Sequence, residues 1–135
     1  MEQLLLHLFG DYIIQNDNVG TRKKEKSLTG LYYCIWHCIT YALPFFLITN
    51  WLGVLLIAIT HFLIDRWNIV GYFIALKNNV WTSNYCSGYY VDKRLDVSNF
   101  GFKPDKPKFL SIWLYIFQDN TLHLLINFAI ITLIK

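Results

Sequence analysis

The chain has 135 residues, of which 55% are hydrophobic, 18% aromatic and only 16% charged, and its mean hydropathy is +0.34. This composition is more apolar than that of an average soluble domain. The length leaves room for one domain of three to four helices that cross a hydrocarbon layer of roughly 30 Å, and it excludes a second, soluble domain. The net charge of +3 is first a signal of membrane topology.

Residues 2–15 predict a short apolar helix, roughly 21 Å long at about 1.5 Å per residue, which enters the bilayer without spanning it. No basic residue precedes it and no small-residue cleavage site follows, so we expect it in the mature protein and not as a signal peptide. A polar loop at 16–27 carries the basic run 22–26 and leads into a full span at 28–49. Pro44 removes a backbone donor inside that span and predicts a kink or local break there.

The second half of the chain contains two more predicted helices. The first covers residues 51–76, with an amphipathic end that runs along the membrane surface, and the second covers 109–134. Between them, residues 77–108 combine glycines, prolines, charges and aromatic side chains, which favours a largely irregular interfacial excursion. The predicted fold is therefore an all-α integral membrane helical bundle of three to four transmembrane helices, organised as a single domain over 1–135.

The positive charges predict the orientation of this bundle. If the loop at 16–27 is cytoplasmic, 11 of the 12 Lys and Arg residues lie on the cytoplasmic side and Lys135 alone lies outside. The positive-inside rule then predicts a multi-pass protein of the cell's inner membrane with most basic loops cytoplasmic. Such runs are routine beside membrane spans, so the run at 22–26 does not indicate a nucleic-acid partner.

All four histidines lie in apolar segments, and three of them have an aspartate four residues away. The pairs are His7 with Asp11, His61 with Asp65, and Asp119 with His123. On a helix this spacing places both side chains on one face. Ionisable side chains are costly inside apolar helices and usually mark function.

Imidazole and carboxylate groups together are ligands of Zn²⁺, Mn²⁺ or Fe²⁺, and such ions activate water and clamp the oxygens of a phosphoester. The predicted ligands of the divalent metal ion are His7, Asp11, His61, Asp65, Asp119 and His123. His37, deeper in its helix, is expected to be a ligand or a proton shuttle. Two other interpretations stay open: the polar groups hydrogen-bond one helix to the next, or they form relay stations in a proton or ion pathway.

Four strings in the chain resemble the family catalogued as domain of unknown function 3307, small integral membrane proteins of bacteria and their phages. The strings are HLFGDYIIQND at 7–17, WHCITYALP at 36–44, HFLIDRW at 61–67 and DNTLHLLIN at 119–127. The resemblance implies a family pattern that falls on His7, Asp11 and Gln15, on His37, on His61, Asp65 and Arg66, and on Asp119 and His123. Asn120 departs from the pattern, because the family usually has Gln there. The excursion at 77–108 is unmatched.

The leading hypothesis is a membrane-embedded, metal-dependent hydrolase of a phosphoester or lipid-linked substrate, a class to which the family is distantly similar. His37, Asp65 and Asp119 are the expected catalytic groups, and Gln15 and Asn120 are expected to orient the ligands. The alternatives are a non-enzymatic phage or bacterial membrane protein that acts on a host membrane partner, and a proton or metal-ion permease. With at most four helices, the permease depends on homo-oligomerisation.

Overall fold

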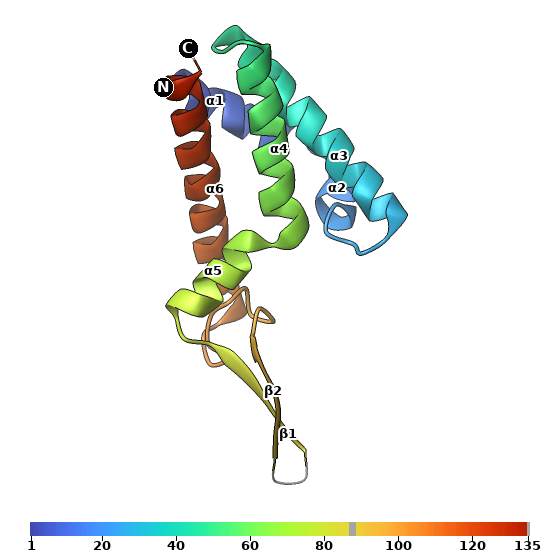
Figure 1. Ribbon diagram of the computed structural model, residues 1–135, viewed down its shortest axis with the longest axis vertical. Helices are drawn as coiled ribbons and strands as arrows, with labels where there is room; N and C mark the ends of the chain where they lie inside the picture. Colours follow the sequence, from blue (N-terminus) through green and yellow to red (C-terminus); the bar gives the residue numbers. More distant parts are fainter. Residues whose placement is uncertain (87–88, 135) are drawn as a thin grey trace. The chain divides into compact units, whose positions relative to one another are not determined.

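The computed structural model describes residues 1–86 and 89–134 and is mostly helical, which confirms the predicted helical character. The elements in chain order are α1 Glu2–Leu8, the π-helix η1 Phe9–Ile14, α2 Asp17–Arg22, α3 Leu28–Ala42, the 3₁₀-helix η2 Leu43–Leu47, α4 Trp51–Trp67, α5 Ile69–Lys77, β1 Trp81–Cys86, β2 Tyr89–Leu95 and α6 Lys108–Leu133 (Figure 1). They divide into two compact units. One comprises Met1–Asn68 together with the segment that starts at Thr121, and the other comprises Ile69–Asn120.

Helix boundaries in the first unit follow from local sequence. α3 begins after Ser27, whose hydroxyl accepts a hydrogen bond from the Gly30 amide at 2.9 Å, and α4 begins after Asn50, which caps its helix in the same way. α3 gives way to the 3₁₀-helix η2 at Pro44, so the predicted break at this proline is confirmed. The helix predicted over 51–76 is instead divided at Asn68, which adopts a left-handed conformation with φ 50° that asparagine tolerates.

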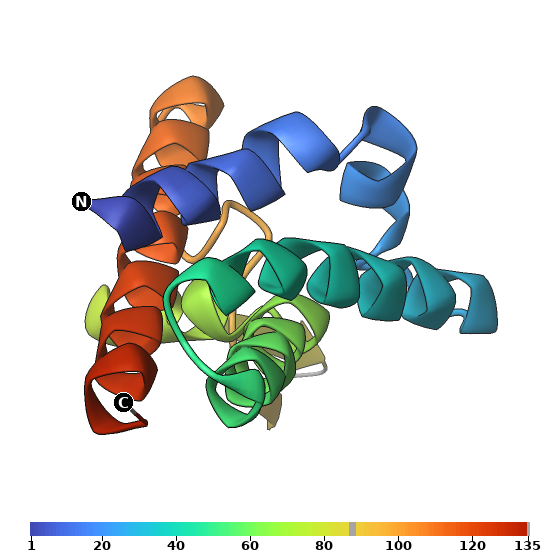
Figure 2. The same cartoon turned by 90° about the horizontal axis from the view of Figure 1, so that it is seen from above.

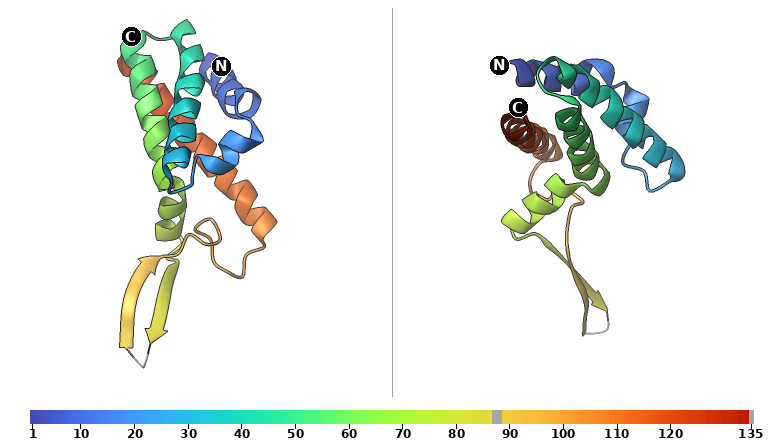
Figure 3. Two further views of the ribbon diagram at one scale, coloured as in Figure 1. Left: turned by 90° about the vertical axis from the view of Figure 1, so that its right-hand side faces the viewer. Right: turned by 45° about the horizontal axis from the view of Figure 1, so that its top comes forward.

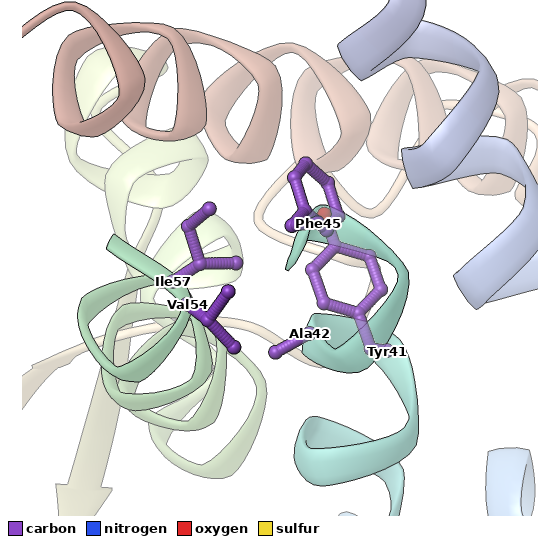
Figure 4. Packing of buried hydrophobic residues seen from close by; sticks show 5 residues of the cluster. All are labelled: Tyr41, Ala42, Phe45, Val54 and Ile57. Carbon is purple, nitrogen blue, oxygen red and sulfur yellow. The ribbon is translucent and has the colours of Figure 1, made fainter. Parts of the chain in front are cut away.

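The core of the first unit joins α3 and η2 to α4. Its buried members are Tyr41, Ala42, Phe45, Val54 and Ile57 (Figure 4). Partly buried side chains from other elements pack against it: Leu6, Ile48, Ala58, Ile130 and Ile131. Figure 2 shows the ribbons of α1, α3, α4 and the later part of α6, the elements that carry these side chains.

The exposed faces of these helices are apolar. The side chains of Tyr32, Trp36 and Ile39 on α3 are exposed, whereas its opposite face buries Cys34 and His37. On α4 the pattern repeats, and the exposed apolar side chains include Leu52, Leu55, Ile59 and Leu63. The helices thus place apolar side chains outside and ionisable ones inside, the reverse of a water-soluble bundle.

Two helical segments of the described chain are long and apolar enough to cross a membrane. They are Leu28–Leu47, which joins α3 and η2, and Lys108–Leu133, which is α6. A third candidate results if Trp51–Trp67 and Ile69–Lys77 count together as one span.

The second unit contains a β-hairpin within the region that we expected to be irregular. β1 and β2 pair antiparallel, with Trp81 opposite Leu95 and Thr82 opposite Arg94, and the register shifts between Asn84 and Tyr85 (Figure 3). Both strands are rich in aromatic and β-branched residues, which favour strands as readily as they favour a membrane interface. The composition alone therefore did not distinguish these two outcomes.

Gly10 in η1 permits the first helix to approach α3 closely. A Cβ atom at this position would lie 2.5 Å from Cδ2 of Tyr41, a ring that is fully buried. Gly10→Ala is therefore expected to destabilise the folded protein by about 1–3 kcal/mol, measured as the free energy of unfolding in mixed micelles. Gly20→Ala is the control, because its Cβ would meet only the end of the Gln15 side chain, at 3.0 Å. Equal stability of the two variants would contradict the packing argument.

Candidate metal centre

The candidate centre is assembled from four separate parts of the first unit. η1 carries Asp11, α3 carries His37, α4 carries His61 and Asp65, and the later part of α6 carries His123. The three imidazoles and Asp65 are buried, with exposures of 1% for His37, 1% for His61, 2% for His123 and 4% for Asp65. Their helices turn these groups inward on the same faces that carry the apolar core.

The shortest contacts of the centre join three groups from three helices. Nε2 of His37 lies 2.9 Å from Nε2 of His61. Oδ1 of Asp11 lies 3.2 Å from the His37 nitrogen and 3.6 Å from the His61 nitrogen. One ligand atom of each residue therefore converges on a common point.

Asp65 approaches the same two nitrogens. Its Oδ2 atom lies 3.3 Å from Nε2 of His61 and 3.6 Å from Nε2 of His37. Oδ2 also accepts a hydrogen bond from Nζ of Lys23 at 2.6 Å. His61, Asp65 and His123 form a second group whose ligand atoms lie within 4.8 Å of one another, as do those of Asp11, His37 and His61.

These separations match those of ligands around a small divalent cation. Tetrahedral ligands at roughly 2.0–2.1 Å from an ion lie about 3.3 Å from each other. The measured edges between the imidazole nitrogens and the two carboxylates run from 2.9 to 3.6 Å. One carboxylate oxygen and the two imidazole nitrogens therefore form a triangle of the size that three ligands form around a tetrahedral metal ion.

Asp11 supplies negative charge to the centre at neutral pH. Burial alone would raise the pKa of its carboxyl, but the close approach of the His37 imidazole at 3.2 Å and the positive charge of Lys23 favour the ionised form and lower the pKa from 3.8 to about 2. The Asp11 side chain retains 13% exposure, against 4% for Asp65. Asp11 is thus an ionised carboxylate that could serve as an oxygen ligand, and it is the more exposed of the two carboxylates.

His7 is held beside the centre by a chain of hydrogen bonds. Nδ2 of Asn127 donates to the hydroxyl of Tyr41 at 2.7 Å, and this hydroxyl lies 2.7 Å from Nδ1 of His7. The Tyr41 ring also stacks on His61, with 3.8 Å between the ring centroids. Tyr41 therefore fixes two of the four imidazoles, one through its hydroxyl and one through its ring.

The structure places the predicted site residues differently. Those in the two groups of potential ligands are Asp11, His37, His61, Asp65 and His123. His7 lies next to them, stacked on His123 with 5.9 Å between centroids, but belongs to neither group within the described chain. Asp119 and Asn120 are half-buried on α6 in the second unit.

Gln15, which we predicted to orient a ligand, lies at the end of η1. Its amide packs against Gly20, and its Oε1 atom is buried without a hydrogen-bond partner among the described residues. Its orienting role stays a prediction.

Sequence reasoning missed Lys23, Tyr41 and Asn127. Tyr41 follows His37 by four residues and Asn127 follows His123 by four. The helical spacing that paired histidine with aspartate would have found both residues if it had been extended to hydroxyl and amide groups. Lys23 gave no such signal, because it lies in a run of basic residues.

The fold and site together define a mostly helical protein with two to three candidate membrane spans and buried histidine and aspartate groups that could hold a metal ion. A family model described as protein of unknown function, DUF3307, matches residues 1–135, so the chain belongs to this family over its whole length. Neither the curated proteins nor the solved structures contain a match.

Tyr41→Phe tests the hydrogen-bond chain that holds His7. The change removes the hydroxyl that contacts Asn127 and His7 while keeping the buried ring, so we expect a loss of about 1–3 kcal/mol in the free energy of unfolding. The matched control is Tyr32→Phe, since Tyr32 lies on the same helix and is 64% exposed. A Tyr41 variant as stable as the Tyr32 variant would show that the hydroxyl contacts do not stabilise the fold.

Proposed function

We propose that the chain is a multi-pass protein of the inner membrane that binds a divalent metal ion and hydrolyses a phosphoester or lipid-linked substrate. The observation that carries this proposal is the convergence of Asp11 Oδ1, His37 Nε2 and His61 Nε2 from three helices at mutual distances of 2.9–3.6 Å. The proposed metal is Zn²⁺, Mn²⁺ or Fe²⁺, whose ligands in proteins include this combination of imidazole and carboxylate.

The distribution of side chains supports insertion in a bilayer. Exposed faces of α3 and α4 are apolar, and the ionisable groups are buried between helices. This arrangement is favourable in hydrocarbon, where polar groups need partners inside the protein. The basic loops give the orientation, with the segment between η1 and α3 on the cytoplasmic side.

The contacts at the two imidazoles favour an ion over simple hydrogen bonds. Nε2 of His37 has three polar neighbours within 3.6 Å, and Nε2 of His61 also has three. A ring nitrogen carries either one proton or one lone pair, so it cannot satisfy three neighbours at once. A cation at the point shared by Asp11, His37 and His61 attracts both lone pairs and the Asp11 carboxylate together.

A divalent ion held there would supply an activated water at neutral pH and polarise a phosphoryl oxygen. The chain's own groups would hold that ion: Asp11 provides charge, His37 and His61 provide neutral nitrogen ligands, and Asp65 lies beside the same two imidazoles. The Asp11 side chain is the more exposed of the two carboxylates, at 13% against 4% for Asp65. Asp119, four residues before His123 on α6, remains a predicted catalytic residue.

Metal content and hydrolysis test the proposal together. The full chain, purified in detergent and dialysed against Zn²⁺ or Mn²⁺, is expected to retain about one ion per chain and to cleave an aryl phosphodiester in a metal-dependent way. Asp96→Asn is the control, because Asp96 is a solvent-accessible carboxylate of the second unit. An ion content equal to that of the buffer blank would refute metal binding. Retention of the ion without cleavage of phosphoesters or lipid-linked substrates would refute the hydrolase.

A further inference from the structure

Lys23 differs from its basic neighbours in where its side chain lies. Arg22, Lys24 and Lys26 are exposed, whereas Lys23 is only 8% exposed and reaches Asp65 in the candidate metal centre. Burying an ammonium group is costly unless it is paired. A lysine that served only to set membrane topology would keep its charge in water, so the inward position of Lys23 calls for another explanation.

Two neighbouring residues fix the backbone that carries Lys23. Nη1 of Arg66 donates to the carbonyl of Lys23 at 3.4 Å and to that of Glu25. Gly30 on α3 lies against the same segment, where a Cβ atom would crowd the carbonyls of Arg22 and Glu25. The loop is thus clamped between α3 and α4, and this clamp directs the Lys23 side chain inward.

The formal charges indicate which kind of ligand the centre would attract once a divalent ion is bound. Without an ion, the two carboxylates of Asp11 and Asp65 exceed the single positive charge of Lys23. A divalent ion reverses the balance and leaves one excess positive charge among buried groups. Such an excess is unfavourable where the dielectric constant is low, and it favours binding of an anion.

We propose that Lys23 and the adjacent ion form a subsite for the phosphoryl group of the substrate. This inference rests on the proposed function, because it needs a metal at the centre. Lysine has three N–H donors, and among the described residues Asp65 accepts the one hydrogen bond found for this ammonium. A phosphoryl group offers several oxygens, so it can contact the metal through one and Nζ through another. A phosphate monoester, free or on a lipid headgroup, has this chemistry.

Titration of phosphate into the zinc-loaded full chain in detergent tests the subsite. Zinc affinity is measured first for the wild type and for Lys23→Met, Lys23→Arg and Lys24→Met. We expect inorganic phosphate to bind the wild type and Lys24→Met equally, to bind Lys23→Arg within about threefold, and to bind Lys23→Met at least tenfold more weakly. Zinc affinity of Lys23→Met is expected to be unchanged or higher, since a competing cation has left Asp65.

A parallel titration with short-chain phosphatidic acid identifies the source of the phosphoryl group. If replacement of Lys23 weakens binding of the lipid alone, the subsite recognises a lipid headgroup. If it weakens binding of both ligands, the subsite recognises the phosphoryl group itself. Equal binding of both ligands by Lys23→Met and the wild type, or binding of neither by the zinc-loaded wild type, overturns the subsite and leaves the metal proposal intact. Absence of zinc binding in the wild type overturns both.

A second experiment tests the subsite without the Lys23→Met variant. If this variant fails to fold, the zinc-loaded wild type with ¹⁵N-labelled lysine side chains is examined by solid-state NMR with bound phosphate. We expect ³¹P–¹⁵N dipolar dephasing that persists in Lys24→Arg and is lost in Lys23→Arg, whose guanidinium lacks the label. Dephasing that is absent, or that survives in Lys23→Arg, overturns the subsite.

Discussion

Alanine at His61 is expected to abolish binding of Zn²⁺ or Mn²⁺, because His61 belongs to both groups of potential ligands in the described chain. Loss of a residue that merely orients a ligand already costs about 10- to 100-fold in metal affinity, so loss of His61 should exceed roughly a hundredfold. Calorimetric titration of the ion into metal-free protein in detergent measures the change.

His7→Asn is the matched control for this prediction. His7 is also a fully buried histidine and lies beside the centre, but it belongs to neither ligand group. We expect this variant to retain metal affinity within about tenfold, the lower end of the effect of an orienting residue. Equal losses for His7→Asn and His61→Ala would show that the affinity reflects general integrity of the helix packing and not ligation.

Asp65→Asn is expected to lower the free energy of unfolding of the metal-free protein by about 3–5 kcal/mol, the usual cost of breaking a buried ion pair. The side chains of Lys23 and Asp65 are 10% and 4% exposed, so the change leaves the Lys23 ammonium without its anionic partner. Unfolding in mixed micelles, followed by circular dichroism, measures the loss.

Lys23→Met provides the other half of a double-mutant cycle. The Asp65 carboxylate still has two imidazoles nearby, and it can ligate zinc, so zinc should restore stability to this variant and not to Asp65→Asn. Addition of zinc stabilises by about 2.7 kcal/mol at a hundredfold excess over its dissociation constant. Rescue of Asp65→Asn by zinc to the same extent as Lys23→Met would remove Asp65 from the set of ligands.

The sequence predicted the individual residues of the candidate site, but it did not predict which of them contact one another. Helical spacing places His61 and Asp65 on one face of α4, and hydropathy indicates that this face is buried. Which faces of different helices meet depends on crossing geometry and on residues such as Gly10 that allow close approach. Contacts between helices produce no periodic pattern in the sequence. The approach of Asp11 to His37 and His61 could therefore be seen only in the structure.

The fold shows the same division between local and tertiary information. Pro44 removes a backbone hydrogen-bond donor whatever its tertiary surroundings, so the break at this residue was predictable. Asn68 adopts a left-handed conformation, and asparagine after a basic last turn is itself a signal for the end of a helix, but the apolar run that continues beyond Asn68 favoured one long helix. Lys23 was misjudged because charge counting treats every member of a basic run alike, although burial distinguishes them.

The π-helical winding of η1 has a consequence for insertions and deletions. Phe9–Ile14 is wound with one residue more per hydrogen-bonded ring than an α-helix, and this segment connects Asp11 to the loop that carries Lys23. Tyr12 and Ile13 are exposed there. Removal of either would leave the segment without the extra residue of its wider ring, so it would have to rewind as an α-helix. In this segment the number of residues is under stronger constraint than their identity.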